Sequence, residues 1–581
     1  MAGSGAVHVT TQRRHYTGKD GRERVYETHL LRRSWREGGK VRNETVANLS
    51  KLPAETVELI RRSLAGERFV AAGQQAQVAR SLPHGHAAAV HAMARKLGLP
   101  ALLGPACPER DLAYALIISR VLRPASKLAT LAWWPDVTMG ADLDLAGAST
   151  DDIHAAMDWL HERQDDIEKR LARRHLAEGG IAMFDLSSSW AEGTHCELAA
   201  FGHSRDGKRG RKQIEYGLLT DKDGRPVAVR AFAGNTADPS AFTEIVTVVR
   251  EKFELEQMIM AGDRGMITSA RITALRELAG MAWITCLRGP AIKKLISDGG
   301  PLQLSLFDEQ DLAEITSDGF PGERLIACRN PVLAEERARK REALLQATEA
   351  DLGKIAARVT AGRLKDPDKI GLAAGKIISK RKVARHFTLD IGDRQLTWQR
   401  NQAAIDAESA TDGIYVIRTP VPAETLDAPA TVAACKNLAG VERDFRSIKA
   451  DDLDLRPIWH RLEDRVRAHV LICMLACHLT WHLRQAWAPL TYTDEHPPAR
   501  PDPVAPARRS PAADAKAARK TGPGKQALRT FRGLLDHLAT LTRNDLRYGD
   551  VTIPALAEPT PTQRRAFDLI GAGIPLTLSP T

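Results

Sequence analysis

Two aspartates follow apolar segments of the chain, where a carboxylate is unexpected. Asp185 follows GIAMF in GIAMFDLSSSW, and Asp263 follows MIMAG in MIMAGDRG. A carboxylate in an apolar strand is costly unless it is paired, hydrogen-bonded or bound to a metal. At the C-terminal end of a strand in an α/β sheet, such a side chain can point into a site. Taken alone, either residue is better explained as a strand-end acid that caps a loop.

Glu442 lies in a segment with helical spacing, LAGVERDFRSIK. At 100° per residue, Glu442, Arg446 and Lys449 share one face of that helix. A neighbouring apolar stripe would anchor the helix on a sheet; its members are Leu438, Val441, Phe445 and Ile448. By itself the pattern favours a solvated face with ion pairs at helical spacing.

Together the three acids suggest a chemistry that none of them suggests alone. Carboxylates that meet at one point repel one another, and cations would relieve that repulsion. Hard oxygen ligands favour magnesium or manganese. Two such ions about 3.5–4 Å apart can activate a water or a 3′-hydroxyl at a phosphodiester. Arg446 and Lys449 beside them would hold phosphates.

The elements that would position these acids alternate between strands and helices over 180–289. Residues 213–234 read as two strands joined by the turn DKDG, and Asp238 and Pro239 would begin a helix as N-cap and first-turn residue. Further strands are expected at 257–263 and 281–287, on either side of a helix. This alternation predicts a mixed α/β layer fold.

The rest of the chain divides by composition and pattern. A basic front end could bind DNA, and an ordinary α+β domain explains it equally well. The front end is expected to contain a basic β-rich module (1–52) and a helical, DNA-end-binding domain (53–150). The core is expected in two parts, 180–289 and 431–488, with Glu442 in the second part and an insertion (290–430) between them. A disordered linker rich in proline, alanine and basic residues (489–528) and a C-terminal tail (529–581) would follow.

Composition narrows the class of protein only coarsely. The 581 residues carry 83 Lys and Arg against 72 Asp and Glu, a net charge of +11, which is a modest excess compatible with a polyanionic partner. Seven scattered cysteines suit a reducing compartment. The N-terminus lacks the apolar run of a signal peptide, and Val470–Leu479 is too short and too polar to span a bilayer. We therefore expect a cytoplasmic, nucleoid-associated protein with no membrane and no small-molecule substrate.

Four ordered blocks resemble the DDE transposases of bacterial insertion sequences, and most closely the branch with a long insertion before the final Glu. They span about 181–485: FDLSSSWAEG, GHSRDGKRGRKQIEYGLLTDKDGRPVAVRAFAGNTADPSAF, MIMAGDRGMIT and VERDFRSIKADDLDLRPIWHRLEDRVRAHVLICMLACHL. The resemblance implies an RNase H-like core, with a mixed sheet flanked by helices, an inserted domain and an α+β N-terminal region. It also implies a metal-binding DDE triad at Asp185, Asp263 and Glu442, which would hold two magnesium or manganese ions.

The positions of the triad agree with that pattern, but the final helix departs from it. Asp263 follows Asp185 by 78 residues, and Glu442 follows Asp263 by 179, which leaves room for the inserted domain. The family's final helix often carries a Tyr, Arg, Glu and Lys signature. Glu442 and Lys449 match its last two positions, whereas Cys435 and Leu438 occupy the first two.

The resemblance implies hydrolysis of DNA at transposon ends and then attack of the freed 3′-hydroxyl on target DNA. Residues 1–150 would recognise the terminal inverted repeats, and Arg446, Lys449 and Arg264 would contact phosphate. Joining two ends predicts at least a dimer on DNA, with the contact in the charged helix at 334–359 or after 525. Two alternatives stay open: a non-catalytic DNA-binding protein derived from a transposase, and an RNase H-like nuclease without strand transfer.

Other patterns have simpler structural explanations. His469, Cys473 and Cys477 suggest zinc, but the first and last lie about 12 Å apart along a helix, too far for one ion, so a buried face is expected. The serines after Asp185 lack a G-x-S-x-G context. Either Trp190 or Trp283 could stack a flipped base, although a core position is the simpler expectation for each. The basic loop 205–212 either follows a DNA backbone or is solvated.

Overall fold

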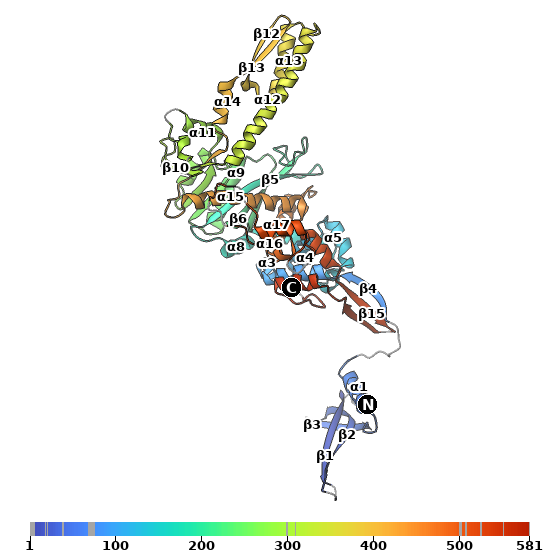
Figure 1. Ribbon diagram of the computed structural model, residues 1–581. Helices are drawn as coiled ribbons and strands as arrows, with labels where there is room; N and C mark the ends of the chain where they lie inside the picture. The colour runs from blue at the N-terminus through green and yellow to red at the C-terminus, as the bar shows by residue number, and fades with distance from the viewer. Residues whose placement is uncertain are drawn as a thin grey trace. The chain divides into compact units, whose positions relative to one another are not determined.

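A computed structural model describes residues 6–17, 19, 21–37, 40–67, 76–297, 300–307, 310–498, 502–505, 508–522, 526–549 and 551–579. The chain divides into two compact units (Figure 1). The smaller unit comprises Met1–Leu82 and Arg543–Ala557, and the larger comprises Pro83–Thr542 and Glu558–Thr581.

The smaller unit contains two antiparallel three-stranded sheets and one helix. The segments that alternate in the sequence form the first sheet, in the order β1-β2-β3, with a register shift between Leu31 and Arg32. The second sheet has the order β16-β15-β4, so the chain's late hairpin pairs with an early strand. The elements are β1 (Ala6–Thr17), β2 (Glu23–Glu37), β3 (Lys40–Asn48), α1 (Ala54–Leu64), β4 (Gln77–Pro83), β15 (Thr542–Tyr548) and β16 (Val551–Leu556).

An eight-stranded mixed sheet organises the larger unit, in the order β10-β11-β14-β9-β8-β5-β6-β7. β5, β8 and β9 run parallel, and the other neighbours run antiparallel. The strands are β5 (Ile181–Trp190), β6 (Gln213–Asp221), β7 (Pro226–Ala233), β8 (Met258–Gly262), β9 (Met281–Cys286), β10 (Leu312–Ile315), β11 (Arg324–Arg329) and β14 (Ile414–Thr419). The predicted mixed α/β fold is confirmed.

Helices flank this sheet. α15 (Ala428–Arg446) packs on β5, β8 and β9, while α8 (Gln164–His175) and α16 (Glu463–Ala486) pack on β7. The larger unit also contains α2 (Gly85–Lys96), α3 (Leu99–Leu103), α4 (Pro108–Leu122), α5 (Lys127–Trp133), α6 (Thr138–Asp142), α7 (Thr150–Glu162), α9 (Asp238–Thr247), α10 (Ser269–Arg276) and α11 (Gly289–Ile296).

Short helical turns connect several of these elements. They are η1 (Trp134–Asp136), η2 (Val248–Lys252), η3 (Leu304–Phe307), η4 (Ala384–His386), η5 (Ser447–Asp451) and η6 (Ala488–Leu490).

α16 is long and apolar enough to cross a membrane by length and composition alone. However, 83% of its most apolar window is buried inside the protein. It packs against α4, α7 and β7, and the core helix of a folded domain passes the same test.

Residues 290–430, expected to form an inserted domain, contribute to two different structures. β10, β11 and β14 extend the central sheet, so the expected boundary at 290 does not separate two sheets. The remainder forms an arm in which α12 packs against α13 and the β12–β13 hairpin (Figure 1). The arm has its own apolar core, which includes Leu352 and Ile370. Its elements are α12 (Pro331–Thr360), α13 (Pro367–Lys380), β12 (Phe387–Gly392), β13 (Gln395–Arg400) and α14 (Gln402–Ser409).

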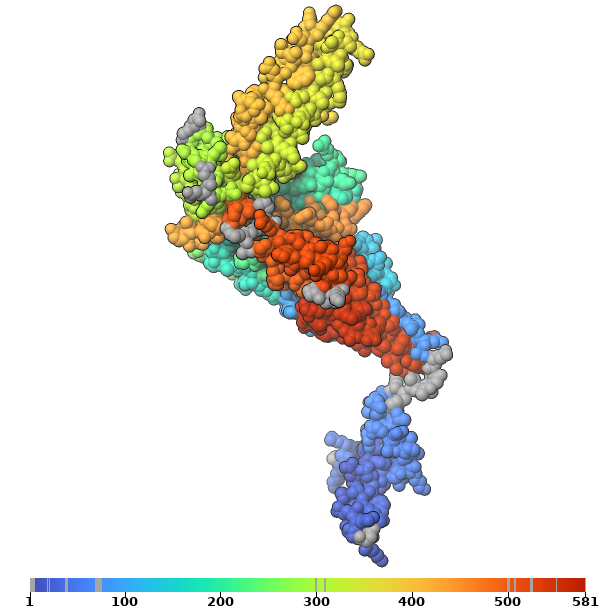
Figure 2. All heavy atoms as spheres, in the orientation of Figure 1, coloured from blue at the N-terminus to red at the C-terminus, as the bar shows by residue number. Residues whose placement is uncertain are grey.

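The region after 488 contains more structure than its composition predicts. α17 (Pro511–Arg519) lies inside the expected disordered linker, where Ser510 bonds to Asp494 and Lys516 pairs with Glu495. α18 (Phe531–Ala539) and α19 (Pro561–Ile570) both pack on α2. Figure 2 shows the C-terminal residues of the larger unit, in red, packed against other residues of that unit.

Candidate active site

Asp185 and Asp263 lie side by side on neighbouring parallel strands. Phe184 on β5 is in register with Gly262, the last residue of β8, so Asp185 is the next residue on β5 and Asp263 directly follows the end of β8. Neighbouring strands lie about 4.8 Å apart, and residues in register point to the same face of a sheet. The buried apolar residues before the two acids make the strands that bring them together, as the sequence predicts.

Glu442 lies on a helix that packs against the strands of these two acids. It is exposed on α15, the helix that packs on β5 and β8. Val441 and Phe445 beside it are buried, as the predicted anchoring stripe requires. The structure therefore gathers all three predicted acids on adjoining elements.

The neighbouring carboxylates act on Asp185. Its pKa is raised to about 6, first by burial and also by the negative charges of Asp263 and Glu442. The Leu186 N–H, 2.8 Å from Asp185 Oδ1, and the charge of Arg205 act in the opposite direction. None of the three acids forms an ion pair with a described residue. The site thus carries unneutralised negative charge at its centre.

The donor set suits a hard divalent cation, since it offers three carboxylates and no sulfur. Asp263 Oδ2 has one internal partner, the Gly265 N–H at 3.2 Å. Across the described ranges, however, no three His, Cys, Asp or Glu side chains already form a closed metal-binding cluster. The residue types fit magnesium or manganese, and their oxygens would have to draw together around it.

Lys449 differs from its predicted role. It is buried, and its Nζ lies 2.9 Å from Asp206 Oδ1, which Arg456 Nη1 also contacts at 2.6 Å. Burial lowers the pKa of Lys449, while the bond to Asp206 raises it. The cause is local: α15 ends at Arg446, and residues 447–451 form the π-helical turn η5. The wider turn rotates Lys449 away from the face of Glu442.

The two arginines predicted to contact phosphate keep accessible positions. Arg446 is exposed at the end of α15, four residues from Glu442. Arg264 is exposed directly after Asp263. Neither side chain is engaged in an ion pair with the described part of the chain, so both charges are free for a phosphate.

A buried acid on the strand next to β5 was not predicted from the sequence. Glu215 on β6 is buried opposite Ser188, and burial raises its pKa to about 7. Arg205 Nη2 donates to Asp238 Oδ1 at 2.8 Å, and the two act on Glu215 with opposite sign. Asp238 was expected to cap its helix, but Ala237 is the N-cap and Asp238 begins the helix. The signal in the sequence was the same as for Asp185, an acid inside an apolar strand.

Two cysteines also meet next to the site. Cys435 on α15, at the position where the resemblance expects Tyr, has its Sγ 3.5 Å from that of Cys286 at the end of β9. The hydrogen bond between the two thiols makes the largest contribution to both of their pKa shifts. It lowers the pKa of Cys286 and raises the pKa of Cys435. The charge of Asp263 acts on both thiols.

The remaining candidates have structural roles. Trp283 is buried in β9, whereas Trp190 is partly exposed, with Lys208 and Arg456 over its ring. His469, Cys473 and Cys477 lie on a buried face of α16. The serines after Asp185 are buried in β5.

Comparison with known proteins identifies the chain as similar to the transposases of insertion sequences. Residues 14–77 match the family described as "IS1634 family transposase, N-terminal domain", which supports the predicted resemblance to insertion-sequence transposases. The matched range covers the N-terminal sheet and α1, and it does not reach the three acids.

Two further comparisons add little. A piggyBac transposase in a synaptic complex with hairpin DNA is 8% identical, with 78% of this chain and 76% of that chain covered and a TM-score of 0.33. No curated protein matches the chain.

Proposed function

We propose that this protein is a DDE transposase that cleaves transposon DNA ends and joins them to target DNA. The observation that carries the proposal is the convergence of Asp185, Asp263 and Glu442, none of which forms an ion pair with a described residue, in a chain that matches a transposase N-terminal domain. Its RNase H-like core would comprise β5 to β9 with α15.

The three carboxylates would hold two magnesium or manganese ions, which polarise the scissile phosphate and activate the attacking hydroxyl. Asp185 and Asp263 would supply ligands from a rigid sheet, because both follow buried strands. Glu442 would complete the set from α15. Since it lies on a helix, a small movement of that helix would open or close the site.

The basic residues would hold the DNA on either side of the reacting phosphate. Arg446 and Arg264, exposed beside Glu442 and Asp263, would contact the backbone. Lys449, paired with Asp206, would instead keep the segment after α15 in place. The N-terminal unit would bind the terminal inverted repeats, and the active form would be a dimer on DNA in the bacterial cytoplasm.

The test is strand cleavage and joining on DNA that carries the gene's own flanking ends, with magnesium and with EDTA. Asp185→Asn and Glu442→Gln should reduce both steps to the EDTA background while DNA binding persists. A matched control is Asp223→Asn, which removes the same charge from an exposed turn residue paired with Lys222. It should leave cleavage unchanged.

Each alternative has its own signature in the same assay. Binding to the ends without cleavage in magnesium or manganese would refute the catalytic proposal and identify a non-catalytic DNA-binding protein. Cleavage without joining would identify a nuclease. Cleavage that survives Asp185→Asn would refute the assignment of the triad.

A further inference from the structure

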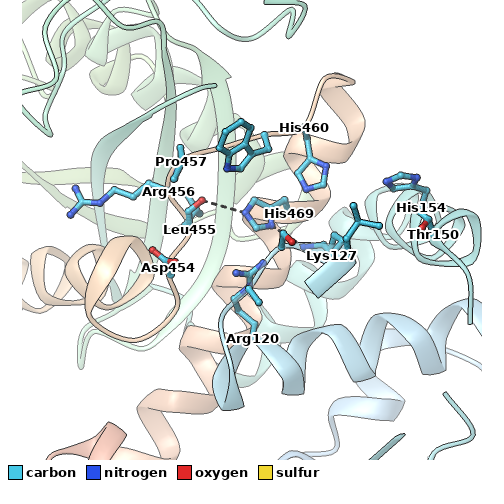
Figure 3. A pocket seen from close by; sticks show the side chains of 14 residues that line it. Arg120, Lys127, Thr150, His154, Asp454, Leu455, Arg456, Pro457, His460 and His469 are labelled. Atoms are coloured by element: carbon cyan, nitrogen blue, oxygen red, sulfur yellow. Dashed lines mark hydrogen bonds between the residues drawn. The ribbon is translucent and has the colours of Figure 1, made fainter. Parts of the chain in front are cut away.

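A cavity of about 360 Å³ lies away from the three acids, and basic groups line it (Figure 3). It is formed where α4, α5 and α16 meet the segment 454–460 that follows η5. Its polar and aromatic lining includes Arg120, Lys127, His154, Trp459, His460 and His469. Cavities of this size commonly hold small ligands or parts of larger ones.

Lys127 is the unusual residue of this cavity. Its side chain is only 8% exposed, and its Nζ donates to His469 Nδ1 at 3.2 Å. His469 Nε2 in turn donates to the Leu455 carbonyl at 3.4 Å, so both ring nitrogens are used by a neutral imidazole. Burial lowers the pKa of His469 well below its ordinary value, which agrees with that tautomer. The bond therefore orients the Lys127 amine, whose pKa burial lowers to about 7, so an anion that binds beside it would also favour its protonated form.

A second buried basic side chain lies near the first, and its charge lowers the pKa of Lys127. Arg120 is 6% exposed on α4, and its Nη1 lies 3.4 Å from the Leu453 carbonyl. Neither cation has an ion-pair partner in the described part of the chain. Asp454, the acid in the lining, is exposed and forms no ion pair with either. Lysine and arginine are rarely buried unless paired, because an uncompensated charge is costly away from water.

The cavity is joined to the strand of Asp185 through the backbone. Ile458, in the cavity-forming segment, pairs with Ala191 just beyond the end of β5. Ala191 is six residues after Asp185, which is about 20 Å along an extended strand. Trp459, 69% exposed, lies at the cavity and is open to solvent.

We infer that Lys127 and Arg120 form a phosphate-binding subsite for the backbone of a DNA strand that runs from the acids toward Trp459. The inference rests on the proposed function, and it adds a contact outside the triad. A phosphate supplies the missing negative charge and the oxygens that both cations can donate to. The cost of burying Lys127 unpaired is then offset when DNA binds.

The experiment measures binding of a short fluorescent duplex from the gene's flanking DNA to the full chain at about 50–200 mM salt. Lys127→Met should reduce the slope of log K against log salt by about one, and the affinity at 0.1 M salt roughly tenfold. Lys127→Arg should keep the slope. The control Lys252→Met removes an exposed lysine whose Nζ lies 3.0 Å from Asp165 Oδ2, and it should change neither quantity.

The outcomes separate the inference from the proposed function. An unchanged affinity and slope for Lys127→Met, in a folded variant with wild-type melting temperature or higher, would overturn the subsite. Thermal stabilisation of the wild type alone by inorganic phosphate, with unchanged DNA binding, would assign it to a free anion and overturn the DNA assignment. No DNA binding by the wild type would overturn both proposals.

Discussion

Replacing Lys127 with methionine should stabilise the protein in the absence of DNA. Burial lowers the pKa of Lys127 from 10.5 to about 7, and the charge of Arg120 acts in the same direction. Between these two values the unfolded chain binds a proton that the folded chain lacks, so the lysine destabilises the folded state as pH falls from 10.5 towards 7. Methionine removes this cost and keeps the length of the side chain.

The size of the effect follows from the two pKa values. At pH 7.5 they predict that Lys127→Met raises the free energy of unfolding by about 4 kcal/mol. At pH 9.5 the predicted increase is about 1.5 kcal/mol. The larger unit has about 480 residues, so its entropy of unfolding is about 1 kcal/mol per degree. The melting temperature should therefore rise by about 4 °C at pH 7.5 and by between 1 and 2 °C at pH 9.5.

The assay is thermal unfolding followed by tryptophan fluorescence at both pH values, with Lys252→Met as the control. His460 and His469 stay neutral over this range, because burial lowers both of their pKa values. Burial also raises the pKa of Cys473 and lowers that of His154, two further titratable groups that interact with Lys127. A lower melting temperature for Lys127→Met at pH 7.5, or a difference that does not depend on pH, would refute the reasoning.

Three further predictions concern the sheet and the site. Glu168→Gln should destabilise the larger unit by about 3 kcal/mol in urea unfolding, because it removes the buried carboxylate that pairs with the buried Arg230 and leaves the half-exposed Asp165 as its remaining ion-pair partner among the described residues; a loss under 1 kcal/mol would contradict this. Manganese affinity, measured by calorimetry, should fall about tenfold per pH unit below about 6, since protons then compete at Asp185; a flat profile would count against metal binding there. Treatment with peroxide should link Cys286 to Cys435, as detected by peptide mass spectrometry, and absence of the link in the folded protein would show that the thiols are held apart.

The strands that carry the two aspartates could be predicted from the sequence because each is a short apolar run that ends at an acid. The helix of Glu442 could be predicted from its apolar stripe. What periodicity could not show is the change of pitch after Arg446, which buries Lys449 against Asp206. A pattern drawn at 3.6 residues per turn assumes that the turn stays constant.

The contacts that were missed join distant parts of the chain. Lys127 meets His469 across 342 positions, and Arg205 meets Asp238 across 33. The local sequence around Lys127 or Arg205 does not indicate which distant residue each one contacts. After residue 488 the composition predicts a disordered linker, but the structure shows order. Lys516 is buried there and pairs with Glu495. Tertiary contacts supplied there what the local sequence lacks.

The arm leaves and rejoins the central sheet at a single point. Arg329 and Ile414 are in register at the ends of β11 and β14, and the Asn330 N–H donates to the Gly413 carbonyl at 2.9 Å. In topological terms the arm is an enlarged hairpin loop between two adjacent antiparallel strands. Such a loop can lengthen, shorten or be exchanged without removing a hydrogen bond from the sheet. The architecture therefore makes the arm a module whose shape can diverge while the strands beneath the acids stay fixed.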